Sequence, residues 1–292
     1  MELRVSRTSA LSISCALAAS ALVASTASTT SAAPARASGT KPAAITKALT
    51  DLYSDSSAPL PPFAWLPASA GLPPEREAMQ DPMSVNPEPI DPVVAFSADG
   101  TTAWIAADLS YTSICGMGDC AKMARDVRRQ RGFHVTAVFD GGKALVAHLA
   151  TTISDKDLAA RVDTSDPDAL PRKIDAGADD AVKLFEASLA DAKALAQTVS
   201  DRADVVLLGS DGHERVVGGK QVRATLTRWG LSFKVRDGVI AGVNGSRSVA
   251  WVAANVDARG KKDKRATPYR ALFVYEKLAS GWQLVQLHFS FA

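Results

Sequence analysis

Two similar stretches decide the fold: TAWIAADL at residues 102–109 and VAWVAANV at residues 249–256. Both place a small residue, a tryptophan, a β-branched residue and two alanines in the same order, and both are expected to form strands. The strands that follow also match, because 133–139 resembles 269–275 and 145–148 resembles 285–288. Three matched strands in one order indicate an internal duplication, with chance similarity between alanine-rich strands as the alternative.

The second copy, residues 178–292, has the more complete pattern. Apolar spacing predicts helices at 179–199, interrupted at the N-cap Asp191, and at 220–229. The turn residues Arg236-Asp237-Gly238 predict a hairpin within 231–243. The other expected strands are 205–208, 248–257, 268–277 and 282–291. A curved antiparallel sheet with about three helices over one face gives an α+β module shaped as a cone with an open end.

The first copy, residues 93–153, is predicted to be a second cone-like module, degenerate and made of an antiparallel meander. Its helices are hard to find, because residues 58–92 hold ten of the fifteen prolines, which exclude a regular helix or a central strand. Phe63 and Trp65 nevertheless indicate that part of this proline-rich segment packs on a core. A short helix is expected at 45–53, and residues 154–177 are expected to link the modules.

The first 27 residues have the pattern of a secretory signal peptide. Arg4 and Arg7 precede an uncharged apolar run at 10–24, and small residues follow. The predicted product is a bacterial-type exported protein, periplasmic or extracellular, with a tether and proline-rich segment at 28–92 and no stable membrane span. A retained anchor is one alternative, and lipidation at Cys15 is another, which Ser12 disfavours because leucine is preferred there.

Cys115 and Cys120 remain once the signal is removed, and two cysteines in an exported protein predict one disulfide. The ring that it closes is short, so we expect about 2 kcal/mol of stabilisation. A metal or redox role for the pair is the alternative. Four histidines and three cysteines in the whole chain leave little for a metal site, and neither a metal nor a cofactor is expected.

The charge balance gives a net charge of only +2, and 6% of the residues are aromatic. A nucleic-acid partner, which needs a basic surface and stacking platforms, is therefore not expected. Basic residues are concentrated at 259–265, in a strand connection. A solvated loop is the simplest interpretation, and an anionic ligand or surface partner is the alternative, because like charges in one loop attract anions.

A family pattern runs through the second copy: AVKLF at 181–185, VVLLGSD at 205–211, glycines at 218–219, TPYRALFVY at 267–275, GWQLV at 281–285 and HFS at 288–290. With these motifs, residues 178–292 resemble the nuclear transport factor 2-like superfamily, in particular its SnoaL-like domains. In that superfamily the cone houses polyketide cyclases, ketosteroid isomerases, hydrolases and many non-catalytic domains. The resemblance therefore implies a fold and leaves the activity open.

Polar residues near the expected mouth of the cone supply the candidate site. His288 is expected to share a face with Gln286 and Leu284, and the strand that carries Tyr269 and Arg270 is expected to be its neighbour. Asp211 and His213 follow the first strand of the module. The catalytic candidates for general acid–base work are His288, Tyr269 and Asp211.

The ligand-binding candidates are Tyr269, Arg270, His288, Trp229 and Trp251. Each candidate also has a structural interpretation. His288 fits a satisfied structural or rim histidine, Asp211 and His213 fit a turn closed by an Asx hydrogen bond, and the tryptophans fit core or rim positions.

Three functions are open on this sequence. The first is a non-catalytic module that binds a small hydrophobic molecule or a protein partner through its cone or sheet face. The second is a proton-transfer enzyme, an isomerase or cyclase, for which two titratable side chains must converge in an open apolar cavity. The third is a structural scaffold or homodimer joined through the sheet, which a continuous sheet–sheet contact within the chain would favour.

Overall fold

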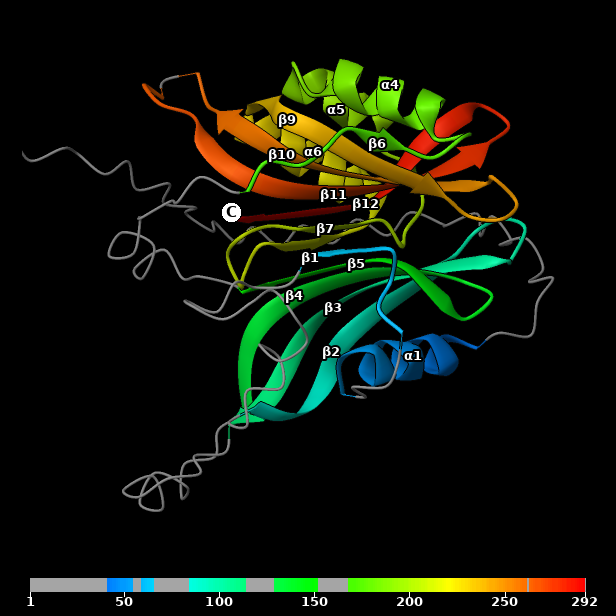
Figure 1. Cartoon of the computed structure of the whole chain (residues 1–292). Helices are drawn as coiled ribbons and strands as arrows, with labels where there is room; N and C mark the ends of the chain where they lie inside the picture. The colour runs from blue at the N-terminus through cyan, green and yellow to red at the C-terminus, as the bar shows by residue number, and fades with distance from the viewer. Residues whose placement is uncertain are drawn as a thin grey trace, which may run out of the picture.

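The computed structural model describes residues 41–54, 59–65, 84–113, 129–151, 168–261 and 263–291. In these residues the chain forms four layers: three helices, a seven-stranded sheet, a five-stranded sheet and one more helix (Figure 1). The predicted α+β class with two sheet modules is confirmed. The predicted signal peptide and both Cys115 and Cys120 lie outside the described residues, so export and the disulfide stay predictions. None of the described helices combines the length and the apolar character needed to cross a membrane.

The seven-stranded sheet has the strand order β6-β9-β10-β11-β12-β7-β8. Its strands are β6 Lys173–Ile174, β7 Val206–Leu208, β8 Arg215–Val217, β9 Ser232–Val243, β10 Val249–Arg259, β11 Thr267–Leu278 and β12 Gly281–Phe291. Helices α4 (Asp179–Ser188), α5 (Ala192–Thr198) and α6 (Gly219–Trp229) pack on one face, as predicted. Asp191 is the expected N-cap, since its carboxylate accepts a hydrogen bond from the backbone N–H of Lys193 at 2.9 Å.

The expected hairpin at 231–243 is wrong, because β9 is one continuous strand. Gly238 is a point of close approach: its N–H donates to the carbonyl of Leu170 at 2.9 Å, and a Cβ there would lie 2.2 Å from that oxygen. Asp237 accepts a hydrogen bond from the side chain of Asn255 on the next strand. The glycine therefore makes room for a crossing segment and does not form a turn.

The five-stranded sheet has the order β1-β5-β4-β3-β2 and draws on the proline-rich segment. Two of its strands, β1 (Phe63–Trp65) and β2 (Ser84–Phe96), begin within 58–92, so this segment is more than a tether. The prolines are tolerated because β2 is an edge strand whose pairing shifts register twice. The remaining elements are β3 Thr102–Ser113, β4 Arg129–Asp140, β5 Lys143–Thr151 and helix α1 Pro42–Ser54, which covers the outer face.

The two sheets repeat one pairing scheme. Strand β1 pairs in parallel with β5, and β7 pairs in parallel with β12. Trp104 lies opposite Val138 and Trp251 lies opposite Val274, and the pairing to the next strand shifts register directly after each of these valines. The repeat extends to irregular features of the ladders, as a duplicated module predicts, although duplication itself stays a prediction.

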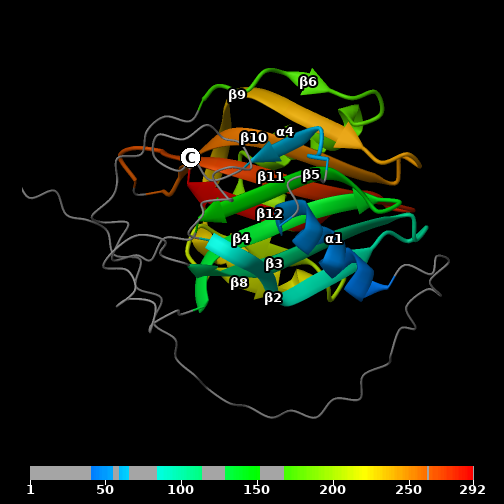
Figure 2. The same ribbon diagram turned by 60° about the horizontal axis from the view of Figure 1, so that its bottom comes forward.

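The inner faces of the two sheets pack against each other. Figure 2 shows the five-stranded sheet, with α1 on its outer face, in front of the seven-stranded sheet. Apolar residues of both sheets form one buried cluster, in which the rings of Phe63 and Trp251 stack at 5.9 Å. At one end, Asp99 accepts hydrogen bonds from the hydroxyls of Ser246 and Ser248 at 2.7 and 2.8 Å. A continuous sheet–sheet contact within the chain, which was expected to favour the scaffold interpretation, is thus present between its two halves.

An ion pair reinforces the same end of the interface. Arg202 lies 2.7 Å from Glu276, which is buried, and Glu276 also accepts a hydrogen bond from the backbone N–H of Ala98 in the other sheet. The guanidinium of Arg202 lies over the Trp104 ring, 5.1 Å from its centroid. Polar and apolar contacts therefore hold the two sheets in one register.

Candidate functional site

The interior between the seven-stranded sheet and its helices is filled by aromatic rings. The Phe185 and Phe273 centroids lie 5.1 Å apart, those of Phe233 and Phe289 lie 5.0 Å apart, and Phe273 meets Phe289 edge to face at 5.4 Å. All four side chains are buried. Across the described residues, the space that the sequence predicted as an open cone is packed core.

Tyr275 is a titratable side chain within this interior. It is fully buried, its ring lies 6.4 Å from that of Phe273, and burial raises its pKa well above the ordinary value. The phenol therefore stays protonated and serves as a polar group in the core. General acid–base chemistry needs a second group and a substrate beside it, and aromatic rings occupy that space.

Tyr269 lies on the opposite face of the sheet from Arg270 and His288. Tyr269 packs on the helix side of the sheet, where its ring stacks on Phe291 at 5.0 Å. Burial, with the nearby charge of Glu214, raises its pKa to about 12. Arg270 is the next residue along β11, so it points to the opposite face, toward the five-stranded sheet.

The expected shared face of His288, Gln286 and Leu284 is also wrong. The β11–β12 ladder shifts register between Val274, which is paired with Gln286, and Tyr275, which is paired with Leu284. This irregularity leaves Leu284 in the helix-side core, whereas Gln286 and His288 face the other sheet. One extra residue reverses the faces of all residues beyond it, which strict alternation along the strand does not anticipate.

The remaining candidates lie elsewhere. Asp211 accepts a hydrogen bond from the backbone N–H of His213 at 2.7 Å, the Asx turn of the structural interpretation, and His213 is exposed. Trp229 is partly buried against the helix-side core. Trp251 lies between the sheets, so close to the backbone that a Cβ on Gly242 would lie 2.7 Å from its ring. The structure therefore distributes the candidates over three separate places.

Three buried histidines do meet, between the two sheets, and we call them the histidine cluster: His134, His148 and His288. The rings of His148 and His288 stack at 3.9 Å, and that of His134 lies 6.2 Å from His288. His148 hydrogen-bonds the Ser290 hydroxyl at 3.0 Å, and Gln286 donates to the Thr136 hydroxyl at 3.1 Å. Each of these contacts joins one sheet to the other.

Burial disfavours a positive charge on the histidine cluster in the folded protein. Burial lowers the pKa of His148 and His288 well below the ordinary value, and the charge of Arg270 and the neighbouring histidines act in the same direction. Burial also lowers the pKa of His134, although the Gly209 carbonyl, 2.9 Å from its Nδ1, and Asp108 oppose this effect. In the described part of the chain, neither ring nitrogen of His288 has a hydrogen-bond partner.

The sequence signal for the histidine cluster was present but incomplete. The internal alignment pairs His148 with His288, and these two positions do contact each other. His134 and Asp108 were not singled out, although the same alignment places them at the positions of Arg270 and Asn255. Within the described ranges, no group of three His, Cys, Asp or Glu side chains is placed to hold a metal ion.

Comparison with known proteins identifies the second module. Residues 180–292 match the family model of the SnoaL-like domain. This part of the chain is a SnoaL-like domain. The match covers less than half of the chain, and no curated protein matches the sequence.

Solved structures of nuclear transport factor 2-like proteins are similar to the chain at low identity. A protein from Parabacteroides distasonis ATCC 8503, provisionally assigned as a ketosteroid isomerase, is 18% identical over 38% of this chain and 85% of its own, with a TM-score of 0.32. A Streptomyces avermitilis protein, provisionally assigned as a dehydratase, is 19% identical over 40% and 94%, with a TM-score of 0.33. A Pseudomonas putida KT2440 protein of unknown function is 16% identical over 39% and 86%, with a TM-score of 0.33. At such low identity and TM-score, the similarity gives no information about activity.

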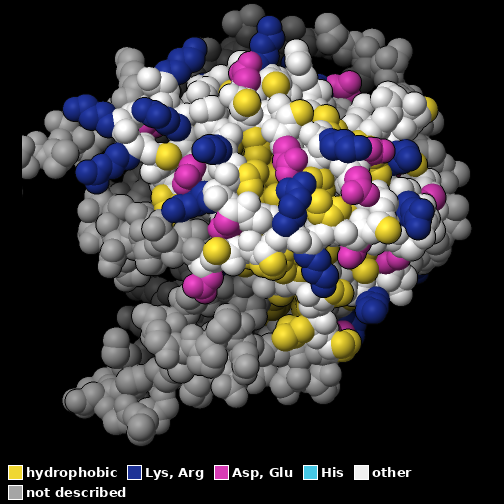
Figure 3. Space-filling model, turned by 45° about the horizontal axis from the view of Figure 1, so that its top comes forward, with side chains coloured by type: hydrophobic (Ala, Val, Ile, Leu, Met, Phe, Trp, Pro, Cys, Tyr) yellow, Lys and Arg dark blue, Asp and Glu magenta, His cyan; other side chains and the backbone are white. Residues whose placement is uncertain are grey.

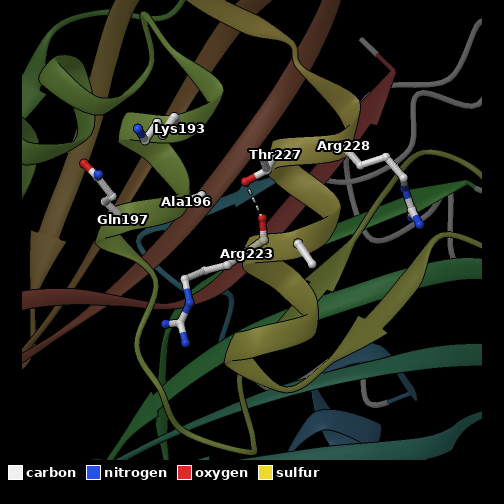
Figure 4. Close-up of a pocket in the computed structure, with 7 residues that line it drawn as sticks. Lys193, Ala196, Gln197, Arg223, Thr227 and Arg228 are labelled. Atoms are coloured by element: carbon white, nitrogen blue, oxygen red, sulfur yellow. Dashed lines mark hydrogen bonds between the residues drawn. The ribbon is translucent and has the colours of Figure 1, made fainter. Parts of the chain in front are cut away.

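The outer surface of the SnoaL-like domain carries a shallow hollow of about 540 Å³ between α5 and α6 (Figure 4). Its lining residues are Lys193, Ala196, Gln197, Arg223, Ala224, Thr227 and Arg228. Arg223 is engaged, because it donates to the Val199 carbonyl at 2.8 Å and pairs with Asp201. Charged side chains of both signs surround the helices on this side (Figure 3). The hollow is open to solvent, and both the helix layer and the seven-stranded sheet separate it from the histidine cluster.

Proposed function

We propose that the protein is a non-catalytic scaffold, in which a SnoaL-like domain and a second sheet module of the same type are joined sheet to sheet within one chain. The observation that carries this proposal is that both faces of the seven-stranded sheet are covered by other parts of the chain. Its helix side is filled by Phe185, Phe233, Phe273 and Phe289, and its other side is covered by the five-stranded sheet. Any ligand or protein partner therefore binds on the outer surface of the molecule.

A ligand-binding cone and a proton-transfer enzyme both require the packed core to open. Proteins of the nuclear transport factor 2-like fold often bind small hydrophobic ligands in the cone and form dimers. A ligand in this cone must displace buried phenylalanines, and opening a packed aromatic core costs about 3–5 kcal/mol for each ring lost. A proton-transfer enzyme must in addition bring a second titratable group to Tyr275.

The proposal also covers how the chain arose and where it is located. We infer that the two sheets arose by duplication, because β1 and β7, the two tryptophans and the register shifts occupy equivalent positions. The N-terminal pattern supports export, after which residues 28–292 form the working protein. The interface inside one chain then replaces a contact between two copies.

Two measurements test this proposal. Light scattering over a range of concentrations should give the mass of one chain, and the midpoint of thermal unfolding should not change on dilution, because the sheet–sheet contact is intramolecular. Titration with a hydrophobic steroid ketone should leave the unfolding temperature unchanged. A saturable rise in that temperature, lost in Tyr275→Phe, would instead establish a ligand site in the cone and overturn the proposal.

A further inference from the structure

The most concentrated positive charge of the described surface lies in the connection between β10 and β11. We call residues 259–265 the basic tip; its sequence is RGKKDKR, with five cations and one carboxylate, and Lys262 alone lies outside the described residues. The hairpin that carries it projects from one end of the seven-stranded sheet, at the upper left of Figure 1. Lys261, Lys264 and Arg265 are exposed.

The single carboxylate of the basic tip closes the turn. Asp263 accepts a hydrogen bond from the backbone N–H of Gly260 at 2.8 Å, and its own N–H donates to the Gly260 carbonyl at 3.1 Å. The backbone carbonyl of Asp263 accepts a hydrogen bond from Arg259 at 3.2 Å. A Cβ on Gly260 would lie 2.7 Å from the Asp263 carboxylate, so the turn is tied by a close contact that glycine permits. The turn is thus fixed from inside, and the exposed cations face outward.

The shape of the basic tip selects the kind of partner. Among the described residues it is the end of a projecting hairpin (Figure 1), so it suits an extended surface better than a small anion, which needs a concave site. Residues 259–266 include no aromatic side chain on which a nucleic-acid base could stack. The net charge of the chain is only +2, so attraction to anions is concentrated at this end.

We propose that the basic tip docks the exported protein on a membrane surface rich in anionic phospholipid headgroups. The choice of a membrane rests on the proposed export, which places the folded modules beside a bilayer. Each cation close to an anionic bilayer strengthens binding roughly fivefold, and the effect falls off within a Debye length. Neutralising three exposed cations should therefore weaken binding on the order of 100-fold.

The test uses residues 28–292 and vesicles of phosphatidylglycerol and phosphatidylcholine in equal parts, with pure phosphatidylcholine for comparison. We expect sedimentation with the anionic vesicles alone, strong weakening between about 50 and about 500 mM salt, and the 100-fold loss in Lys261→Gln/Lys264→Gln/Arg265→Gln. The matched control is Lys183→Gln/Lys193→Gln/Arg228→Gln, which removes the same charge from exposed positions on the helix side. It should bind as the unchanged protein does.

Three results would overturn the proposal: no binding to anionic vesicles, equal binding to both kinds of vesicle, or equal loss in the two triple variants. Unchanged circular dichroism melting curves show that both variants fold. Vesicle binding does not depend on whether the cone is filled or the chain is monomeric. Failure here and failure of the scaffold proposal are therefore distinguishable.

Discussion

Acidification should weaken this fold through the stacked histidines between its sheets. His148 and His288 are fully buried, and burial holds the pKa of each well below 6.5. Below about pH 6.5 the unfolded chain binds a proton at each position and the folded chain does not. The unfolded state then holds more protons, so the free energy of unfolding falls as the pH falls.

The size of the effect follows from proton linkage. A histidine that stays neutral in the fold lowers the free energy of unfolding by up to about 1.4 kcal/mol for each pH unit below its unfolded pKa. Between about pH 7.5 and about pH 5.5, His148 and His288 together should remove about 3 kcal/mol. His134 acts in the same direction, because its pKa is also lowered. This loss is a large share of the roughly 5–15 kcal/mol that stabilises a typical domain.

The assay is urea denaturation followed by tryptophan fluorescence at several pH values. In His288→Phe the stability lost between about pH 7.5 and about pH 5.5 should shrink by about 1.4 kcal/mol, the share of one histidine. At about pH 7.5 the variant should be at least as stable as the unchanged protein, because both ring nitrogens of His288 lack a partner. His213→Gln, at an exposed histidine, is the control and should keep the original pH dependence. An unchanged pH dependence in His288→Phe would refute a neutral, buried His288.

Three further substitutions test the core and the interface. Phe273→Ala should lower the free energy of unfolding by about 3–5 kcal/mol in urea denaturation, because it removes the ring that contacts both Phe185 and Phe289; a loss below about 1 kcal/mol would mean that the cone is not packed. Glu276→Gln should cost about 2 kcal/mol in the same assay, since it breaks the buried pair with Arg202; an unchanged stability would contradict that pair. Gly242→Val should lower the thermal midpoint, at a cost of about 1–3 kcal/mol, because its Cβ meets the Trp251 ring; a raised midpoint would show spare room there.

Local signals predicted much of the secondary structure. The N-cap at Asp191, the helix that ends at Trp229 and the long strands around Trp104 and Trp251 all follow from apolar spacing and capping chemistry. These signals act over a few residues, so they survive in any tertiary setting. The sequence failed where a distant segment sets the local structure. Gly238 resembles a turn residue, and only the crossing of Leu170 shows that it lies within a strand.

The sequence by itself determined the α+β class, the three helices of the SnoaL-like domain and the repeated strand pattern. The tertiary structure decided which of the two faces each polar residue occupies. The shift between Val274 and Tyr275 separates His288 from Leu284, and the packing of one sheet on the other joins His288 to His148. Side chains alternate with a period of two, so one inserted residue reverses the face of a strand and leaves almost no trace in composition. Contacts between residues about 140 positions apart depend on that choice, and for this reason the site could be found only in the folded chain.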